Sequence, residues 1–271
     1  MKHNVMPHRS RLLIPLLLVL VAIIGISRYF SYQKTSSLQE TAKSDVVKKD
    51  SIAKEVLCTR ESRLENRPSY DRALSLIAEK YDLWEKSGEG FGSYYFFPSK
   101  LVNCIQANEG EVRNTSGAEG FFKFNDDQIK DNYFPITIDR DYSYNDDILN
   151  ALLLVHEITH VQQYLDTVNG KPSLSCIDKE SEAFFAQFQF YSIQFPEVRK
   201  SMDLRIENDK NLHPQLAMIQ NIKNTMSLNG VRAKCLNNKD NEDKNCIENY
   251  RKNEIKQMLM KDDFYLKQCG L

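Results

Sequence analysis

Residues 151–160 read ALLLVHEITH, an apolar run that ends in two histidines four positions apart with a glutamate between them. Ahead of this run, Asn145 can cap a helix, and Asp146 and Asp147 complement the positive end of its dipole. Apolar residues occupy most sides of this helix, which predicts that it is buried and runs to about Asp166. We expect the rest of the domain to be built around it.

The two histidines and the glutamate have the arrangement that a catalytic metal needs. His156 and His160 lie one turn apart on the same helix face, so both imidazoles can bind one cation. Glu157 projects about a third of a turn away, where it can act as general base toward a water that zinc acidifies. Burial of these groups costs free energy unless a metal or hydrogen-bond partners satisfy them. The pattern predicts a zinc site, and the alternative is a pair of hydrogen-bonded core histidines with an acid nearby.

A zinc site of this kind needs a third protein ligand. No histidine follows at the short spacing that metzincins use. A second predicted helix begins near Ile177 and ends at Pro196, and its first turns carry Asp178, Glu180 and Glu182. Each of these carboxylates can serve as the ligand, and all three would also complement the positive end of that helix.

The helix with two histidines, followed by a helix that carries Glu180, resembles the gluzincin metallopeptidases, in which a glutamate on a later helix completes the zinc site. Nineteen residues separate His160 from Glu180, a spacing common in that family. Ala183 matches the small residue that often stands three positions after the ligand glutamate of gluzincins. The resemblance implies a zincin-like fold with Glu180 as the third zinc ligand and Glu182 as the runner-up.

The resemblance covers residues 134–194 and extends beyond the metal ligands. Gluzincins bind extended substrates by strand addition to an edge strand ahead of the active-site helix, and residues 135–139 have the alternation of such a strand. A hydrogen bond from a neighbouring residue can orient His160. The candidates are the α-helical carboxylate that is not a ligand, Gln162 and Gln163. Some gluzincins stabilise the oxyanion with a downstream histidine or tyrosine. The residues available for that role are His213, Tyr142, Tyr144 and Tyr191.

Three functions agree with these patterns. The first is a zinc-dependent peptidase of the cell envelope that cleaves a peptide or protein substrate with Glu157 as general base. The second is a catalytically inactive metal-binding or interaction module anchored at the membrane. The third is an interaction protein in which the motif is accidental. The resemblance to gluzincins favours the first.

The remainder of the chain predicts an α+β domain that is mainly helical. Apolar residues at helical spacing predict helices at 52–57 and 73–84, and more polar helices from 197 onward. Short apolar segments parted by Pro, Gly and Asn-Asp turns predict a small mixed sheet ahead of the active-site helix. The predicted strand segments are 94–97, 101–105, 120–124 and 134–138.

The N-terminus carries an apolar run at 12–26 that basic residues precede. The run favours a single-pass membrane anchor, and the basic residues ahead of it place the catalytic domain outside the cytoplasm. Gly25 and Ser27 also suit a signal peptidase, and cleavage after Ser27 would give a secreted protein. The expected parts are a cytoplasmic tail at 1–11, an anchor or signal peptide at 12–28, a flexible stalk at 29–54 and a metallopeptidase-like domain at 55–271.

The charge balance of the chain argues against a nucleic-acid partner, and its cysteines favour disulfides. Lys and Arg number 36 against 37 Asp and Glu, so no net field attracts nucleic acid, and we expect no nucleic-acid partner. All six cysteines follow the apolar run, and none forms a C-x-x-C pair. This pattern favours disulfides, with Cys235–Cys246 as the first pair expected because it closes a short polar loop. The alternative is a set of reduced thiols in the core.

Overall fold

A computed structural model of the chain describes the segments that surround the histidine motif. The described residues are 66, 68–87, 97–112, 119–123, 134–140, 146–210, 213–226, 235 and 244–271. All of them belong to one compact unit, which is Val47–Val112 with Ala118–Leu271. The helices and strands, in chain order, are α2 (Pro68–Ser87), the 3-10 helix η2 (Ser99–Cys104), β1 (Ile105–Gly110), β2 (Gly120–Phe122), β3 (Phe134–Asp139), α5 (Asp147–Val168), α6 (Cys176–Ser192), α7 (Pro196–Asn208), α8 (Pro214–Thr225), α10 (Lys244–Leu259) and α11 (Asp263–Gln268).

The helix that carries the motif, α5, is capped by Asp146. The Asp146 carboxylate accepts hydrogen bonds from two backbone N–H groups of the first turn, each at 3.1 Å. This corrects the expected cap, Asn145, which lies outside the described residues. The helix continues slightly past the expected end at Asp166, and Gly170 follows it with φ +85°, where a side chain would be strained. A glycine suits this chain reversal because it adopts the left-handed conformation freely.

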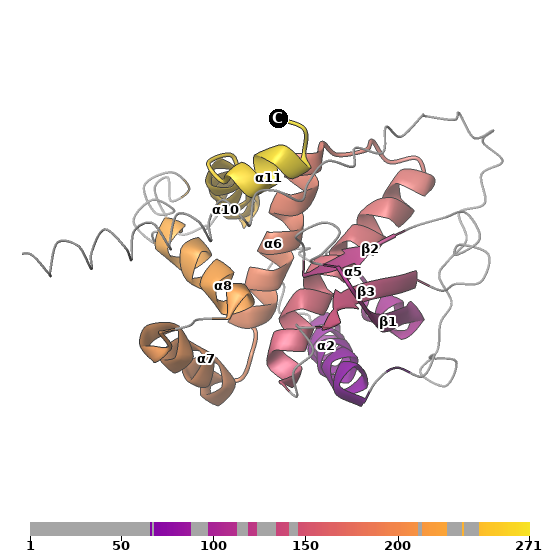
Figure 1. Cartoon of the computed structure of the whole chain (residues 1–271), viewed down its shortest axis with the longest axis vertical. Coiled ribbons are helices and arrows are strands. Elements are labelled where there is room, and N and C mark those ends of the chain that lie inside the picture. Colours follow the sequence, from indigo (N-terminus) through magenta and orange to yellow (C-terminus); the bar gives the residue numbers. More distant parts are fainter. Residues whose placement is uncertain are drawn as a thin grey trace, which may run out of the picture. The chain divides into compact units, whose positions relative to one another are not determined.

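α5 is buried because its sequence is apolar on most sides. Fourteen of its 22 residues are buried, and His156, Glu157 and Thr159 of the motif are among them. Figure 1 shows α5 next to α2, α6 and the sheet, and it packs against all three. The prediction of a buried helix is therefore confirmed, and the histidine motif lies inside the main core.

The described sheet has three strands and is mixed. β3 lies in the middle, with β1 parallel to it and β2 antiparallel to it. The expected α+β class, mainly helical with a small mixed sheet ahead of the motif helix, is confirmed. The predicted strand at 101–105 is wrong, because residues 99–104 form η2 and β1 begins only after it. Leu101 and Val102 are adjacent and both fully buried, which suits a tight helical turn better than a strand with one buried face.

The strand that we expect at the edge of the sheet lies at its centre. Residues 135–139 fall in β3, whose Phe134, Ile136 and Ile138 side chains are fully buried. Among the described strands, β1 and β2 form the edges. The prediction of an edge strand at 135–139 is therefore wrong. Alternation of apolar and polar residues shows that one face of a strand is buried, but it does not distinguish a central strand from an edge.

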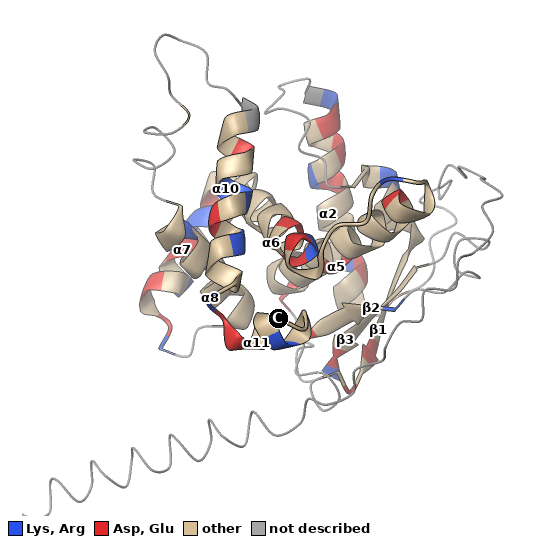
Figure 2. Ribbon diagram, turned by 90° about the horizontal axis from the view of Figure 1, so that it is seen from above, with Lys and Arg blue, Asp and Glu red and all other residues tan. Residues whose placement is uncertain are grey.

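Helix α10 lies along α6, the helix that follows the motif. Ser181 Oγ donates a hydrogen bond to the backbone carbonyl of Lys252 at 2.7 Å. Lys256 forms an ion pair with Asp178 at 2.6 Å. Figure 2 shows basic and acidic residues on several of the described helices, and Lys256–Asp178 is a pair that joins two of them. The start of α6 is thereby held between α5 and α10.

Two disulfides join described cysteines. Cys235–Cys246, the first pair expected from the sequence, is confirmed. Cys176–Cys269 links the first residue of α6 to the residue after α11, across 93 positions. Cys104 is also disulfide-bonded. The alternative of reduced core thiols is therefore wrong for the described cysteines.

The expectation that a single-pass anchor holds the protein at a membrane is not supported by the structure. Within the described ranges, no helix combines the length and the apolar character needed to cross a bilayer. A crossing helix needs about 20 mostly apolar residues, whereas α5, although 22 residues long, carries the polar motif and serves as the core of the domain. The segments assigned to tail, anchor and stalk, 1–11, 12–28 and 29–54, lie outside the described residues. The anchored, extracytoplasmic assignment is therefore withdrawn.

Candidate metal centre

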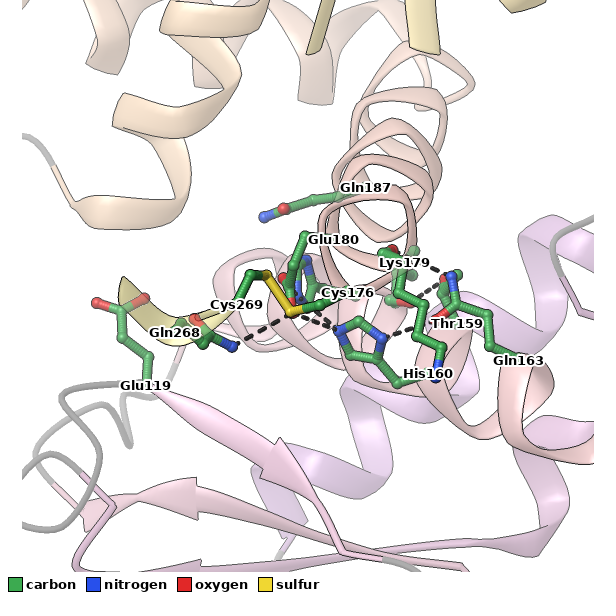
Figure 3. Close-up of polar contacts among 12 residues, drawn as sticks. Glu119, Thr159, His160, Gln163, Cys176, Lys179, Glu180, Gln187, Gln268 and Cys269 are labelled. Atoms are coloured by element: carbon green, nitrogen blue, oxygen red, sulfur yellow. Dashed lines mark hydrogen bonds and ion pairs between the residues drawn. A yellow bond between two sulfur atoms is a disulfide. The ribbon is translucent and has the colours of Figure 1, made fainter. Parts of the chain in front are cut away.

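Three side chains from two adjacent helices converge at one point. His156 and His160 come from α5, and Glu180 comes from the second turn of α6. Because α5 and α6 pack against each other, the Glu180 carboxylate faces the imidazoles (Figure 3). His156 and Glu180 are buried, with 8% and 7% exposure, and His160 is partly exposed. The structure thus brings together the three residues that the sequence suggests as metal ligands.

The distances among the three groups fit a tetrahedral ion. His156 Nε2 lies 3.2 Å from His160 Nε2 and 3.4 Å from Glu180 Oε2. His160 Nε2 lies 3.6 Å from Glu180 Oε1. Zinc bonds of about 2.1 Å at tetrahedral angles separate ligand atoms by about 3.4 Å. Two imidazoles and a carboxylate are also the donor set of catalytic zinc sites, so the residues present fit this ion and leave its fourth position open.

The hydrogen bond that His160 donates to Gln163 decides which tautomer His160 adopts. Gln163 Nε2 donates to the backbone carbonyl of Lys179 at 3.0 Å, so its other amide atom, Oε1, must be an acceptor. That oxygen lies 2.9 Å from His160 Nδ1, which therefore carries the proton. The lone pair of His160 is then on Nε2, the atom that faces Glu180. Gln163 takes the orienting role that the sequence analysis leaves open between several residues.

The other two acidic residues of α6 have different partners. Glu182 accepts a hydrogen bond from Gln163 Nε2 at 3.2 Å and lies 3.4 Å from Lys252 Nζ. Glu182 therefore contacts Gln163, the residue that orients His160, and is not one of the three converging groups. Asp178 pairs with Lys256 and with the Ser175 hydroxyl, at 2.6 and 2.5 Å. Gln162, the other orienting candidate, donates instead to Asp166 at 2.8 Å.

The charge of Glu180 is stabilised by its neighbours. Burial alone would raise the pKa of Glu180, but charge interaction with His160 and a hydrogen bond with His156 lower this pKa below its ordinary value. Gln268 from α11 adds a hydrogen bond, with its Nε2 donating to Glu180 Oε1 at 3.3 Å (Figure 3). The carboxylate is thus kept ionised, which is the form that binds a cation.

Glu157 is buried beside strand β2 and has the protonation behaviour of a base. Burial raises the pKa of its carboxyl group from 4.5 to about 7, and the negative charge of Glu180 adds to this effect. Charge interaction with His160 and the backbone N–H of Phe122, which donates to Glu157, act in the opposite direction. A side-chain carbon at Gly120 would lie 3.3 Å from Glu157 Oε1, so glycine leaves room for the carboxylate.

Like Gln268, Tyr265 on α11 is a residue at this site that sequence analysis misses. Its ring stands 5.4 Å from the ring of Phe184, which in turn stands 4.4 Å from the ring of His156. Burial raises the pKa of Tyr265, and the carboxylates of Glu180 and Glu157 raise it further. Tyr265 therefore keeps its proton and lies within the electrostatic reach of the cluster. No motif marks this tyrosine, because it reaches the site from the far end of the chain.

The residues proposed from sequence for the oxyanion have other roles or lie outside the described chain. His213 caps α8, with Nδ1 accepting from the backbone N–H of Gln215 at 3.3 Å. The Tyr191 hydroxyl bonds Asp203 and accepts from Lys223 Nζ at 3.1 Å. The remaining two, Tyr142 and Tyr144, fall among residues that the structure does not describe.

Comparisons of the chain with protein-family models, curated proteins and solved structures found no match. The interpretation of the cluster therefore depends on its own geometry and chemistry.

Proposed function

We propose that the domain is a zinc-dependent peptidase of the gluzincin type with a zincin-like fold. The observation that supports this most is the convergence of three donor groups. The two Nε2 atoms lie 3.2 Å apart, His156 Nε2 lies 3.4 Å from Glu180 Oε2, and His160 Nε2 lies 3.6 Å from Glu180 Oε1, all close to the separation of about 3.4 Å between ligands of one zinc ion. In this proposal His156, His160 and Glu180 hold the ion. Core histidines that only hydrogen-bond each other would not need a buried carboxylate beside both.

The chain's own groups would divide the chemistry of peptide hydrolysis among them. Zinc, when bound, supplies Lewis acidity toward water and a peptide carbonyl. In this proposal Glu157 would take the proton of the attacking water and pass it to the leaving amine. Tyr265 stays protonated and can donate a hydrogen bond to the oxyanion that forms on the substrate.

In this proposal the strand that binds the substrate is β2 and not β3, because β2 lies at an edge of the described sheet. The backbone N–H of Asp139 donates to the Glu119 carbonyl at 2.8 Å, which makes these residues a hydrogen-bonded pair of the ladder between β2 and β3. In an antiparallel ladder such pairs alternate, so the N–H groups of Gly120 and Phe122 point away from β3. Phe122 donates to Glu157 from that side. An extended peptide that pairs with this edge would therefore run past the general base.

Three variants test the proposal, each measured for zinc affinity and for cleavage of a mixed peptide library. Glu157→Gln should keep zinc and lose hydrolysis by about 10²–10⁴-fold, as expected for removal of a general base. Glu180→Ala should lower zinc affinity by more than about 100-fold, because loss of a residue that only hydrogen-bonds a metal ligand already costs about 10–100-fold. Glu182→Ala is the matched control and should cost less than about tenfold.

The outcomes separate the proposal from its alternatives. Zinc binding without cleavage of any peptide by the unaltered protein would indicate an inactive metal-binding module. A protein that takes up no zinc under zinc-replete conditions would indicate an accidental motif. Equal losses of zinc in the Glu180→Ala and Glu182→Ala variants would reject Glu180 as the ligand.

A further inference from the structure

The C-terminal helix α11 reaches the cluster although few contacts hold it. None of its residues is fully buried. Tyr265 and Cys269 only pack, partly buried, against the smaller of the two described core clusters. A covalent bond compensates for this, because Cys269 is joined to Cys176 at the first residue of α6. The anchor point lies one helical turn before Glu180 (Figure 3).

Two side chains of α11 connect it to the site, Gln268 directly and Tyr265 through Phe184. Gln268, the residue before Cys269, donates a hydrogen bond to Glu180 Oε1, the oxygen nearer to His160. Tyr265, one turn earlier, packs on Phe184, whose ring stacks edgewise on His156. A carboxylate oxygen that accepts a hydrogen bond can still bind a metal with its other lone pair, and the bond fixes the direction in which it does so.

We propose that Gln268 is a positioning residue of the metal centre, acting through Glu180, and that the Cys176–Cys269 disulfide exists to keep it there. This inference depends on the zinc site of the proposed function but not on turnover. Without the disulfide, α11 is a six-residue helix with no buried side chain. A helix this short has little stability of its own and stays ordered only where other contacts hold it. Loss of the tether would therefore release Gln268 and Tyr265 together and leave Glu180 less well oriented.

The first experiment measures the role of Gln268 by zinc affinity, with a chelating dye as competitor. Gln268→Met has nearly the same shape but no N–H donor, and we expect it to weaken zinc binding by about tenfold. Lys267→Ala, an exposed neighbour on α11, is the matched control and should change the affinity by less than about twofold. Cobalt substituted for zinc gives a visible absorption spectrum, which should change in Gln268→Met and not in Lys267→Ala.

A double-mutant cycle shows whether Gln268 acts through Glu180. In the Glu180→Ala background no side-chain oxygen remains to accept from Gln268, so Gln268→Met should then cost less than about twofold. A purely structural effect of Gln268 would weaken zinc binding by the same factor in both backgrounds. Equal factors would therefore overturn the positioning role, as would an unchanged cobalt spectrum in the single variant.

The second experiment removes the disulfides one at a time. Cys176→Ser with Cys269→Ser should weaken zinc binding by at least the factor seen for Gln268→Met. Cys235→Ser with Cys246→Ser is the matched control and should leave the affinity within about twofold, because this pair joins positions only 11 residues apart, at the start of α10, and does not tether α11. Far-ultraviolet circular dichroism checks that both proteins are folded. Adding Gln268→Met to the first variant should give no further loss.

Chemical reduction extends the same test to the unaltered chain. A dithiol reductant is oxidised to its own disulfide and transfers two electrons and two protons, which leaves Cys176 and Cys269 as thiols. Zinc affinity should fall to the value of the double serine variant. Unchanged affinity in that variant overturns the inference while leaving the zinc site intact, whereas absence of zinc binding in the unaltered protein overturns the proposed function itself.

Discussion

The raised pKa of Glu157 predicts a stabilising mutation at a buried acidic residue of the candidate metal centre. The folded, metal-free domain holds this pKa at about 7, whereas the unfolded chain has the ordinary value of 4.5. A difference of this size corresponds to about 3 kcal/mol, because each pKa unit is about 1.4 kcal/mol. Glu157→Gln removes the ionisation and keeps an oxygen that can accept from the Phe122 N–H. We therefore expect this variant to be more stable than the natural protein at high pH.

The dependence on pH follows from the direction of the shift. Below pH 4.5 the carboxyl group is protonated in both states, so it imposes no penalty on folding. Between pH 4.5 and about 7 the unfolded chain ionises first, which progressively destabilises the fold. Above about pH 7 both states are ionised and the penalty reaches its full value. The gain from Glu157→Gln should therefore be near zero at pH 4 and about 3 kcal/mol at pH 8.

Urea unfolding of both metal-free proteins at a series of pH values between 4 and 8 measures this gain. The m-values should agree, because the two proteins expose the same surface on unfolding. A gain of the same size at all pH values would mean that shape and not ionisation is responsible. No gain at pH 8 would show that Glu157 is not desolvated, and the argument for a buried base would then fail.

Three further predictions concern neighbours of the site and the core. Gln163→Ala should weaken zinc binding by about tenfold, measured by dye competition, and no change would mean that His160 is oriented without it. Gly120→Ala places a carbon 3.3 Å from Glu157 Oε1, so peptide cleavage should fall by about tenfold while zinc affinity stays constant. Leu154→Ala, fully buried in α5, should cost about 2–5 kcal/mol in urea unfolding, and a loss below about 1 kcal/mol would contradict its place in the core.

The helices of the site were predictable from local signals. The apolar pattern of 151–160 requires a buried helix, and i, i+4 spacing places His156 and His160 on one face whatever surrounds them. The start of the next helix was predicted within one residue, because Gly170 breaks the chain before it, whereas the helix ends at Ser192 and the expected end, Pro196, begins α7. Local periodicity and helix breakers are properties of short segments, so they are visible without the fold.

The choice among the acidic residues of α6 was not predictable from the same signals. Asp178 and Glu182 lie one turn apart on one face of the helix and Glu180 lies on nearly the opposite face, so the side of α6 that packs against α5 decides which carboxylate faces the histidines. The structure turns Glu180 toward them and leaves Glu182 with Gln163 and Lys252. Similarly, the position of a strand within a sheet depends on its partners, which is why β3 was misassigned to the edge.

The amino-acid sequence by itself determined the α+β class, the buried helix with two imidazoles and an acid on it, and the disulfide between Cys235 and Cys246, because each depends on residues close together in the chain. Only the tertiary structure decided which carboxylate completes the cluster and which residues support it. Gln268 meets Glu180 across 88 positions, and Cys269 meets Cys176 across 93. Contacts at such separations arise from the packing of whole helices, which no local pattern records.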